Sequence, residues 1–123
     1  NHAPDEIPVN YVLQRGGKTV LIGNDTGWWS AESWDLLRQY ELDAAILECT
    51  YLHLDPDAMD HHLGIGTLVR VRDRLAAQGT LKPDARVVTN HFSHNGMTLH
   101  EELCEHLLPH GIGVGYDGMV LDV

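Results

Sequence analysis

The sequence predicts an α/β fold, because apolar segments of strand length alternate with amphipathic segments of helical length along the chain. The turn dipeptides Gly16-Gly17 and Asp117-Gly118 lie near the two ends of the chain, and helix-capping residues precede the segments of helical length. The predicted element order is ββαβαβαββ. No repeat, linker or low-complexity tract interrupts residues 1–123, so they form one domain or part of one.

The first half of the chain contains a predicted hairpin, a helix and a buried strand. Residues 9–25, VNYVLQRGGKTVLIGND, predict two strands joined at a glycine pair that tolerates the positive φ of a tight turn. Ser30 can cap a helix over residues 31–40. Residues 43–49, DAAILEC, have the near-continuous apolar character of a strand that is buried on both sides.

A second helix and strand follow. Residues 64–79 have the periodicity of an amphipathic helix and end at a glycine. The apolar face of this helix is predicted to contain Ile65, Leu68, Leu75 and Ala76. Residues 85–90, ARVVTN, predict the next strand.

The last part of the chain predicts a helix and a closing hairpin. The helix opens with a capping box formed by Thr98 and Glu101 and stops before Pro109. Its expected buried residues are Leu99, Leu103 and Leu107. The closing hairpin covers residues 112–123 and turns at an Asp-Gly pair.

Composition excludes several classes of partner. Eighteen acidic and eight basic residues give a formal charge of -10, which disfavours nucleic acid and anionic membranes unless bound cations reverse the charge locally. No segment has the apolar length of a membrane span, and the polar start NHAPDEIP differs from a signal peptide. The two cysteines lack the spacing of a zinc ribbon or a disulfide framework. We therefore expect a soluble, cytoplasmic protein.

Metal-competent side chains occur where predicted strands end. Asp25 follows the second strand, Glu48 ends the third and His91 follows the fourth. Open α/β sheets build their sites at the carboxyl ends of strands. His62 lies just before a predicted helix, and His2 precedes the first strand. These positions raise the hypothesis of a metal site at one edge of the sheet.

Each of these residues also has an ordinary structural interpretation. An aspartate after a strand is commonly a turn residue or a helix cap, and we favour the interpretation of Glu48 as a strand-end carboxylate held by neighbouring amides. The remaining histidines are expected to be solvated or to pack, namely His53, His61, His100, His106 and His110. Spacing alone leaves metal binding undecided.

Five short motifs together carry a resemblance to a known family. They are NHAP, GNDTG, DHHLGIG, TNHFSH and GYDGMVLDV, in this order from Asn1 to Val123. In this order and approximate spacing the chain resembles the C-terminal half of a metallo-β-lactamase-fold hydrolase, and it is most similar to the PhnP-like phosphodiesterases. The resemblance implies half of an αββα sandwich, a mixed sheet with helices on one face.

The resemblance also implies roles for individual residues. His2, Asp25 and His91 match metal ligands, and Asp25 matches the carboxylate that bridges two metals. His62 matches a histidine that protonates or orients the substrate, and His94 matches a substrate-side or outer histidine; both are catalytic candidates. The implied cofactors are two divalent metal ions, zinc or manganese with iron as an alternative. The implied substrate is a small phosphodiester or cyclic phosphate.

The chain departs from the family in one respect. The signature HxHxDH, which supplies most ligands of the first metal, does not occur in it. We therefore expect residues 1–123 to be a C-terminal half-domain whose partner is the N-terminal half, inactive alone and prone to form a homo-oligomer. Three alternatives remain open: a ribonuclease-Z-like nuclease, a lactonase, or a non-catalytic half-domain that assembles with a partner.

Overall fold

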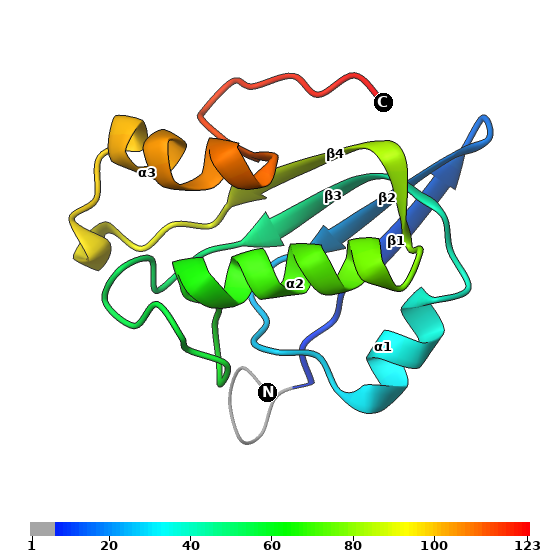
Figure 1. Ribbon diagram of the computed structural model, residues 1–123, viewed down its shortest axis with the longest axis horizontal. Helices are drawn as coiled ribbons and strands as arrows, with labels where there is room; N and C mark the ends of the chain where they lie inside the picture. Colours follow the sequence, from blue (N-terminus) through cyan, green and yellow to red (C-terminus); the bar gives the residue numbers. More distant parts are fainter. Residues whose placement is uncertain (1–6) are drawn as a thin grey trace.

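A five-stranded mixed sheet organises the computed structural model, which describes residues 7–123 (Figure 1). The strands lie in the sheet in chain order, and they are β1 (Tyr11–Arg15), β2 (Lys18–Gly23), β3 (Leu42–Glu48), β4 (Leu81–Asn90) and β5 (Ile112–Val114). β1 pairs with β2 in antiparallel orientation, and every later pair is parallel. The predicted α/β class is confirmed, and the glycine-pair hairpin is present. His2 lies outside the described residues.

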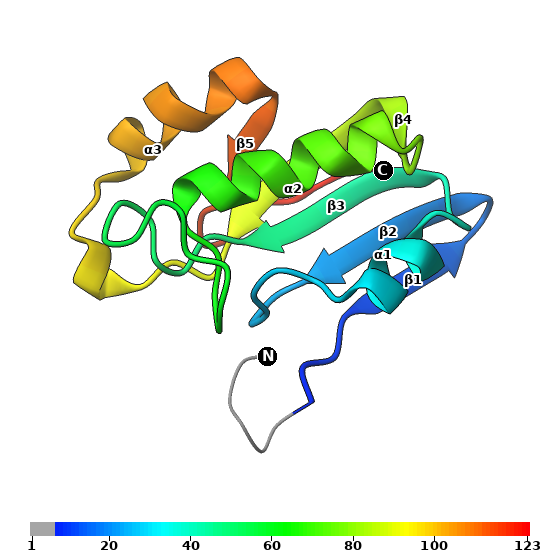
Figure 2. The same cartoon turned by 60° about the horizontal axis from the view of Figure 1, so that its bottom comes forward.

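Three α-helices cover one face of this sheet. They are α1 (Ala31–Leu37), α2 (Ile65–Ala77) and α3 (His100–Leu107), and two short 3-10 helices, η1 (His94–Gly96) and η2 (Leu108–His110), flank α3. Figure 2 shows α1 in front of the β1–β2 hairpin and α2 in front of β3 and β4. None of the helices within residues 7–123 has the length and apolar character that a membrane span requires.

The hydrophobic core lies between the helices and this face of the sheet. Leu21 of β2 and Leu47 of β3 contribute from the sheet, and Trp34, Leu68 and Leu103 contribute from the three helices. All five side chains are almost completely buried. Burial of a leucine-sized side chain stabilises a fold by about 1.5–3 kcal/mol, so this one-sided core holds the helices against the sheet.

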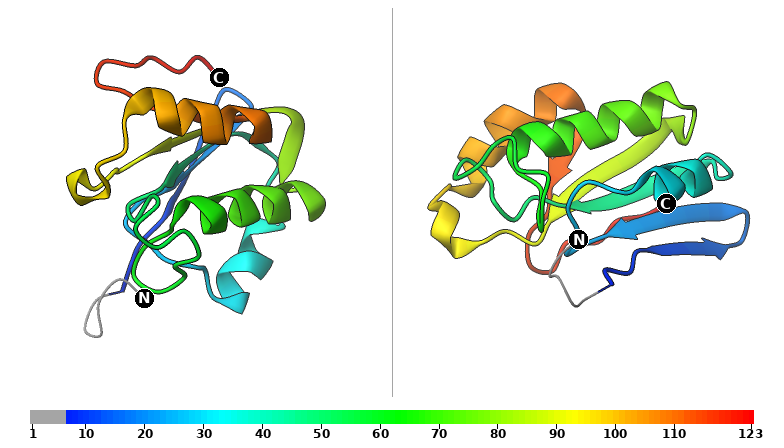
Figure 3. Two further views of the ribbon diagram at one scale, coloured as in Figure 1. Left: turned by 60° about the vertical axis from the view of Figure 1, so that its left-hand side comes forward. Right: turned by 90° about the horizontal axis from the view of Figure 1, so that it is seen from below.

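No helix of the described residues covers the opposite face of the sheet, which carries apolar side chains. Cross-strand register places Tyr11 beside Ile22 and Leu13 beside Val20, and Ile22 in turn lies beside Ile46. Tyr11 and Leu13 are more than half exposed. Figures 1 and 3 show that the C-terminal segment after β5 runs back on the side of the sheet away from α2. We call this side the open face.

The predicted closing hairpin over residues 112–123 is wrong. Only β5 is a strand, and it pairs in parallel with β4. Gly118 does adopt a positive φ in the expected turn. After this turn the chain runs along the open face and forms no further strand within the described residues. Its end lies beside Lys18 and Arg86. Within residues 7–123 no strand pairs with the outer edge of β5.

The predicted start of the last helix is also wrong, by one residue. Leu99 is the N-cap of α3, and its backbone N–H donates to Glu102 Oε2 at 2.9 Å. The Thr98 hydroxyl is engaged elsewhere, because it donates to the Gly96 carbonyl at 2.9 Å. Leu99 therefore lies outside the core and is 64% exposed. Leu103 and Leu107 are buried as predicted.

The apolar face of α2 differs from the prediction at two positions. Leu68 and Leu75 are buried as expected, but Ala76 is exposed, and Val71 takes its place in the core. Val71 lies three residues after Leu68 and four before Leu75, so the three side chains share one face. Ile65, at the start of the helix, is partly buried.

Asp43 connects three strands near the beginning of β3. Its carboxylate accepts a hydrogen bond from Lys82 Nζ of β4 at 2.8 Å. It also accepts from the Thr19 backbone N–H at 2.9 Å and from Lys18 Nζ at 3.2 Å, both in β2. The Lys82 hydrogen bond, followed by those of Thr19 and Lys18, lowers the pKa of Asp43 to about 2.

Replacement of Asp43 should change how the stability of the protein depends on pH. A carboxyl group whose pKa is lowered by folding adds stability only where it is ionised, so its contribution is full above about pH 4 and disappears as the pH falls through about 2. Asp43→Asn should therefore lower the free energy of unfolding at neutral pH, with a difference that shrinks in acid. Urea unfolding at about pH 7, 4 and 2, followed by tryptophan fluorescence, measures it. Asp117→Asn, in the exposed C-terminal turn, is the control. A loss of unfolding free energy in Asp43→Asn that does not change with pH would contradict the role of the ionised Asp43 carboxylate.

Candidate metal centre

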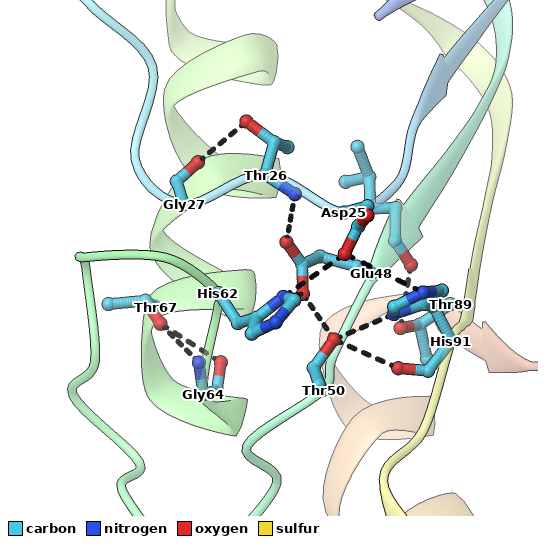
Figure 4. A network of polar contacts seen from close by, with 11 residues as sticks. Asp25, Thr26, Gly27, Glu48, Thr50, His62, Gly64, Thr67, Thr89 and His91 are labelled. Carbon is cyan, nitrogen blue, oxygen red and sulfur yellow. Dashed lines mark hydrogen bonds and ion pairs between the residues drawn. The ribbon is translucent and has the colours of Figure 1, made fainter. Parts of the chain in front are cut away.

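The carboxyl ends of β2, β3 and β4 meet at one edge of the sheet because these strands are parallel. Asp25 lies two residues after β2, Glu48 is the last residue of β3, and His91 directly follows β4. His62 reaches the same place from the loop that connects β3 to α2 (Figure 4). The edge thus collects two carboxylates and two imidazoles from four separate segments.

Three of these side chains form a cluster that could hold a metal ion, namely Asp25, His62 and His91. Asp25 Oδ1 lies 3.7 Å from His62 Nδ1 and 3.8 Å from His91 Nε2. One ligand atom from each of the three residues lies within 4.8 Å of the other two. Asp25 and His91 are about half exposed, whereas the His62 side chain is 14% exposed. The cluster is therefore open to solvent on the side of Asp25 and His91.

The backbone takes an uncommon conformation beside the cluster. Asp25 and His91 have φ values of 54° and 57°, and His61, next to His62, has 63°. Positive φ is unfavourable for most residues, although aspartate and histidine tolerate it better than bulky or β-branched residues do. Such conformations gather at functional sites, where the surrounding structure compensates their cost. The left-handed His91 directly follows β4, and Asp25 lies two residues after β2. Figure 4 shows the Asp25 and His91 side chains directed toward one another.

Glu48 lies beneath the cluster and is completely buried. One carboxylate oxygen accepts the Thr26 backbone N–H, and the other accepts the Thr50 hydroxyl and lies 3.0 Å from His62 Nδ1. Burial raises the pKa of Glu48, and the hydrogen bonds from Thr50, Thr26 and the Leu63 backbone N–H oppose this rise. The predicted amide-held carboxylate is confirmed. The sequence did not predict its contact with His62.

Thr50 links Glu48 to His91, a role that the sequence did not predict. Its hydroxyl oxygen lies 2.9 Å from His91 Nδ1 and 3.0 Å from the His91 carbonyl oxygen. The spacing of Glu48 and Thr50 was the available signal. Residues two apart in an extended chain point to the same side, so a threonine in this position could have been expected beside the carboxylate.

His94 does not join the cluster. It begins η1 and lines a separate cavity of about 290 Å³ together with Met97 and His100. The His53 ring packs against the His106 ring with centroids 4.7 Å apart. His61 and His110 are exposed, in agreement with the solvated positions expected for them.

The donor set of the cluster fits a divalent metal. One carboxylate and two imidazoles are ligands that zinc, manganese and iron accept in proteins. Two ligands of a tetrahedral zinc ion are separated by about 3.3 Å. The three ligand atoms lie within 4.8 Å of one another, with 3.7 and 3.8 Å around Asp25 Oδ1, so they would move inward to bind one ion. Three donors leave coordination positions open. In the part of the chain that the structure describes, the cluster supplies ligands for a single ion.

Comparison of the sequence with known protein families gives no match, and comparison with curated proteins gives none either.

Removal of the Glu48 carboxylate should destabilise the fold. Glu48→Leu should lower the free energy of unfolding by about 2–4 kcal/mol, because the Thr26 N–H and the Thr50 hydroxyl would lose a buried acceptor. Glu48→Gln should cost less, since its amide oxygen still accepts. Urea unfolding followed by tryptophan fluorescence measures both losses. The exposed Glu105→Leu in α3 is the matched control, and a Glu48→Leu variant as stable as the native protein would contradict the interpretation.

Proposed function

We propose that this chain is the C-terminal half of a metal-dependent hydrolase of the metallo-β-lactamase superfamily, and that the complete site hydrolyses small phosphodiesters in the manner of the PhnP-like enzymes. The cluster of Asp25, His62 and His91 is the observation that carries the proposal. These residues belong to three of the motifs on which the resemblance depends, and they come from three segments that are distant in sequence. Their meeting at one edge is what a shared metal site requires.

Asp25 and His91 are the residues of the described chain that would hold metal. The resemblance adds His2, which lies outside the described residues, and assigns Asp25 the bridging position between two ions. Two divalent cations bound there would supply an activated water and would offset the negative charge of a phosphoryl group. Because the chain carries a formal charge of -10, its own residues would otherwise repel an anionic substrate.

His62 is proposed to donate a proton to the leaving group. Its Nδ1 lies 3.0 Å from the buried Glu48 carboxylate, which stabilises the protonated ring and holds it in orientation. Tyr51 packs edge-on against the His62 ring, with centroids 5.3 Å apart. These two contacts limit the freedom of the ring beside Asp25. The same histidine is also close enough to act as a metal ligand, so the two roles must be separated by experiment.

The open face of the sheet supports the half-domain part of the proposal. In an αββα sandwich two sheets pack face to face, and each has its helices on the outer side. Here the helices cover one side of the sheet. The other side carries apolar side chains that are neighbours across the strands, namely Tyr11, Leu13, Val20, Ile22 and Ile46. The same face favours a second candidate, a non-catalytic half-domain that assembles with a partner. Metal binding and hydrolysis distinguish the two.

Substitution of either proposed ligand should weaken metal binding. Asp25→Asn and His91→Asn are the preferred changes, because asparagine accepts the left-handed backbone that both positions adopt. Each should raise the Kd of Zn²⁺ at least about 10-fold, since the site loses one of its few donors. Calorimetric titration of the metal-free protein with Zn²⁺ measures the change.

His110→Asn is the control for this titration, because His110 is an exposed histidine of η2 outside the cluster. It should bind Zn²⁺ as the native chain does. Equal affinity in all four proteins would place the bound zinc elsewhere and would remove the main support for the proposed function.

The role of His62 should appear in the dependence of rate on the leaving group. In the enzyme assembled with the half that carries HxHxDH, His62→Ala should slow hydrolysis of phenyl phosphodiesters by about 100- to 10,000-fold, and should slow bis(p-nitrophenyl) phosphate much less, because nitrophenolate leaves without protonation. His110→Ala should leave both rates unchanged. Equal losses on both esters would assign His62 to metal binding. A cyclic ribose phosphate, an RNA and a lactone, tested alongside, identify the substrate class.

A further inference from the structure

We infer that Thr50 is a positioning residue whose hydroxyl places the imidazole proton of His91 on Nδ1 and thereby leaves Nε2 unprotonated toward Asp25. The inference rests on the proposed metal site, because the tautomer determines which nitrogen of His91 can bind the metal. Its basis is the set of contacts around one hydroxyl group, which connects the buried Glu48 to an exposed histidine (Figure 4).

The Thr50 hydroxyl has three polar neighbours but only one proton. Glu48 Oε2 and the His91 carbonyl oxygen, at 3.0 Å, are acceptors, and His91 Nδ1 lies 2.9 Å away. The Thr50 proton can therefore satisfy one acceptor only. The hydroxyl oxygen retains lone pairs that can accept a proton from the third neighbour. That neighbour is His91 Nδ1, which becomes the N–H donor.

The other tautomer of His91 is less favourable in this arrangement. With the ring proton on Nε2, Nδ1 would need the Thr50 proton for itself. Glu48 Oε2 and the His91 carbonyl would then both face hydroxyl lone pairs at hydrogen-bond distance, an unfavourable contact for a buried carboxylate. Glu48 accepts the Thr26 N–H on one oxygen, and His62 Nδ1 lies 3.0 Å from Oε2. Donors at both oxygens favour the ionised carboxylate, which faces Thr50 as an acceptor. The network thus favours proton placement on Nδ1.

This tautomer has a consequence at the cluster. His91 Nε2 lies 3.8 Å from Asp25 Oδ1, and with Nδ1 protonated it presents a lone pair to the carboxylate. Two acceptors that face one another are stabilised by a cation between them. Metal-binding histidines usually donate their other ring N–H to an outer partner, which sets the tautomer and the ring orientation. Thr50 supplies that partner here, and Glu48 holds Thr50.

Thr50→Val and Thr50→Ser test the inference in the metal-free protein. Valine keeps the shape but gives Nδ1 no acceptor, so the His91 proton should move to Nε2, where Asp25 can accept it. Serine keeps the hydroxyl and should restore the native tautomer. Two-bond ¹H–¹⁵N correlation spectra of histidine-labelled protein at about pH 8, where imidazoles are neutral, distinguish the protonated nitrogen. The His91 signals are those that disappear in His91→Asn.

Zinc affinity provides a second measurement. Thr50→Val should raise the Kd of Zn²⁺ about 10- to 100-fold, as loss of an outer partner of a ligating histidine does in other sites. Thr50→Ser should bind as the native protein does. Thr80→Val is the matched control, because Thr80 is a buried threonine whose hydroxyl donates to the Leu37 carbonyl at 3.3 Å, away from the cluster. It should change neither the His91 tautomer nor zinc binding.

The outcomes separate this inference from the proposed function. An Nε2–H tautomer in the native protein, an unchanged tautomer in Thr50→Val, or a shifted tautomer in Thr50→Ser would overturn the inference even if the chain binds zinc. A tautomer that shifts in Thr50→Val and returns in Thr50→Ser would support it. If no variant, including the native chain, binds zinc, that spectroscopic result still stands and the proposed metal function fails.

Discussion

The burial of the Glu48 carboxylate is the constraint on which the edge of the sheet depends. A charged group without water is strongly unfavourable unless donors surround it. Its donors come from three loops: Thr26 follows β2, Thr50 follows β3 by two residues, and the His62–Leu63 segment precedes α2. Because each loop must return to the same two oxygen atoms, the loops are placed relative to one another. The cluster of Asp25, His62 and His91 lies directly above this arrangement.

This constraint gives the site an inner and an outer layer. Glu48 and Thr50 form the inner layer, and they contact the ring nitrogens of His62 and His91 that lie nearest the protein. Asp25, about half exposed, faces solvent in the outer layer. A metal centre needs ligands held in place from behind and an open side toward substrate. The arrangement around Glu48 has both properties.

The one-sided core has a separate consequence. The helices bury one face of the sheet, and the C-terminal segment runs along the other without forming a strand. Tyr11 and Leu13 of the outer hairpin remain more than half exposed on this face. Exposed apolar faces of this kind are typical of surfaces that another unit covers. The proposed half-domain and the alternative of a partner-binding module both agree with this feature.

Local chemistry in the sequence determined most of the fold. Apolar runs such as AAILE and RVVT, the glycine pair of the first hairpin and the Ser30 cap each act within a few residues, and the structure confirms the elements that they predict. The closing hairpin failed because the turn at Gly118 was present but the partner strand was not, and pairing depends on where the returning segment runs. The helix start failed because Thr98 had a competing acceptor in Gly96, only two residues away.

The candidate site, too, could be predicted only in part. Strand periodicity and the parallel topology it implied were enough to place Asp25, Glu48 and His91 at one edge, since the ends of parallel strands coincide. Tertiary structure alone decided that His62 returns from a long loop to within 3.0 Å of Glu48, that Thr50 joins Glu48 to His91, and that His94 turns away into another cavity. The paths of these loops depend on a buried carboxylate that needs hydrogen-bond donors from segments distant in sequence. A local sequence pattern cannot predict such long-range contacts.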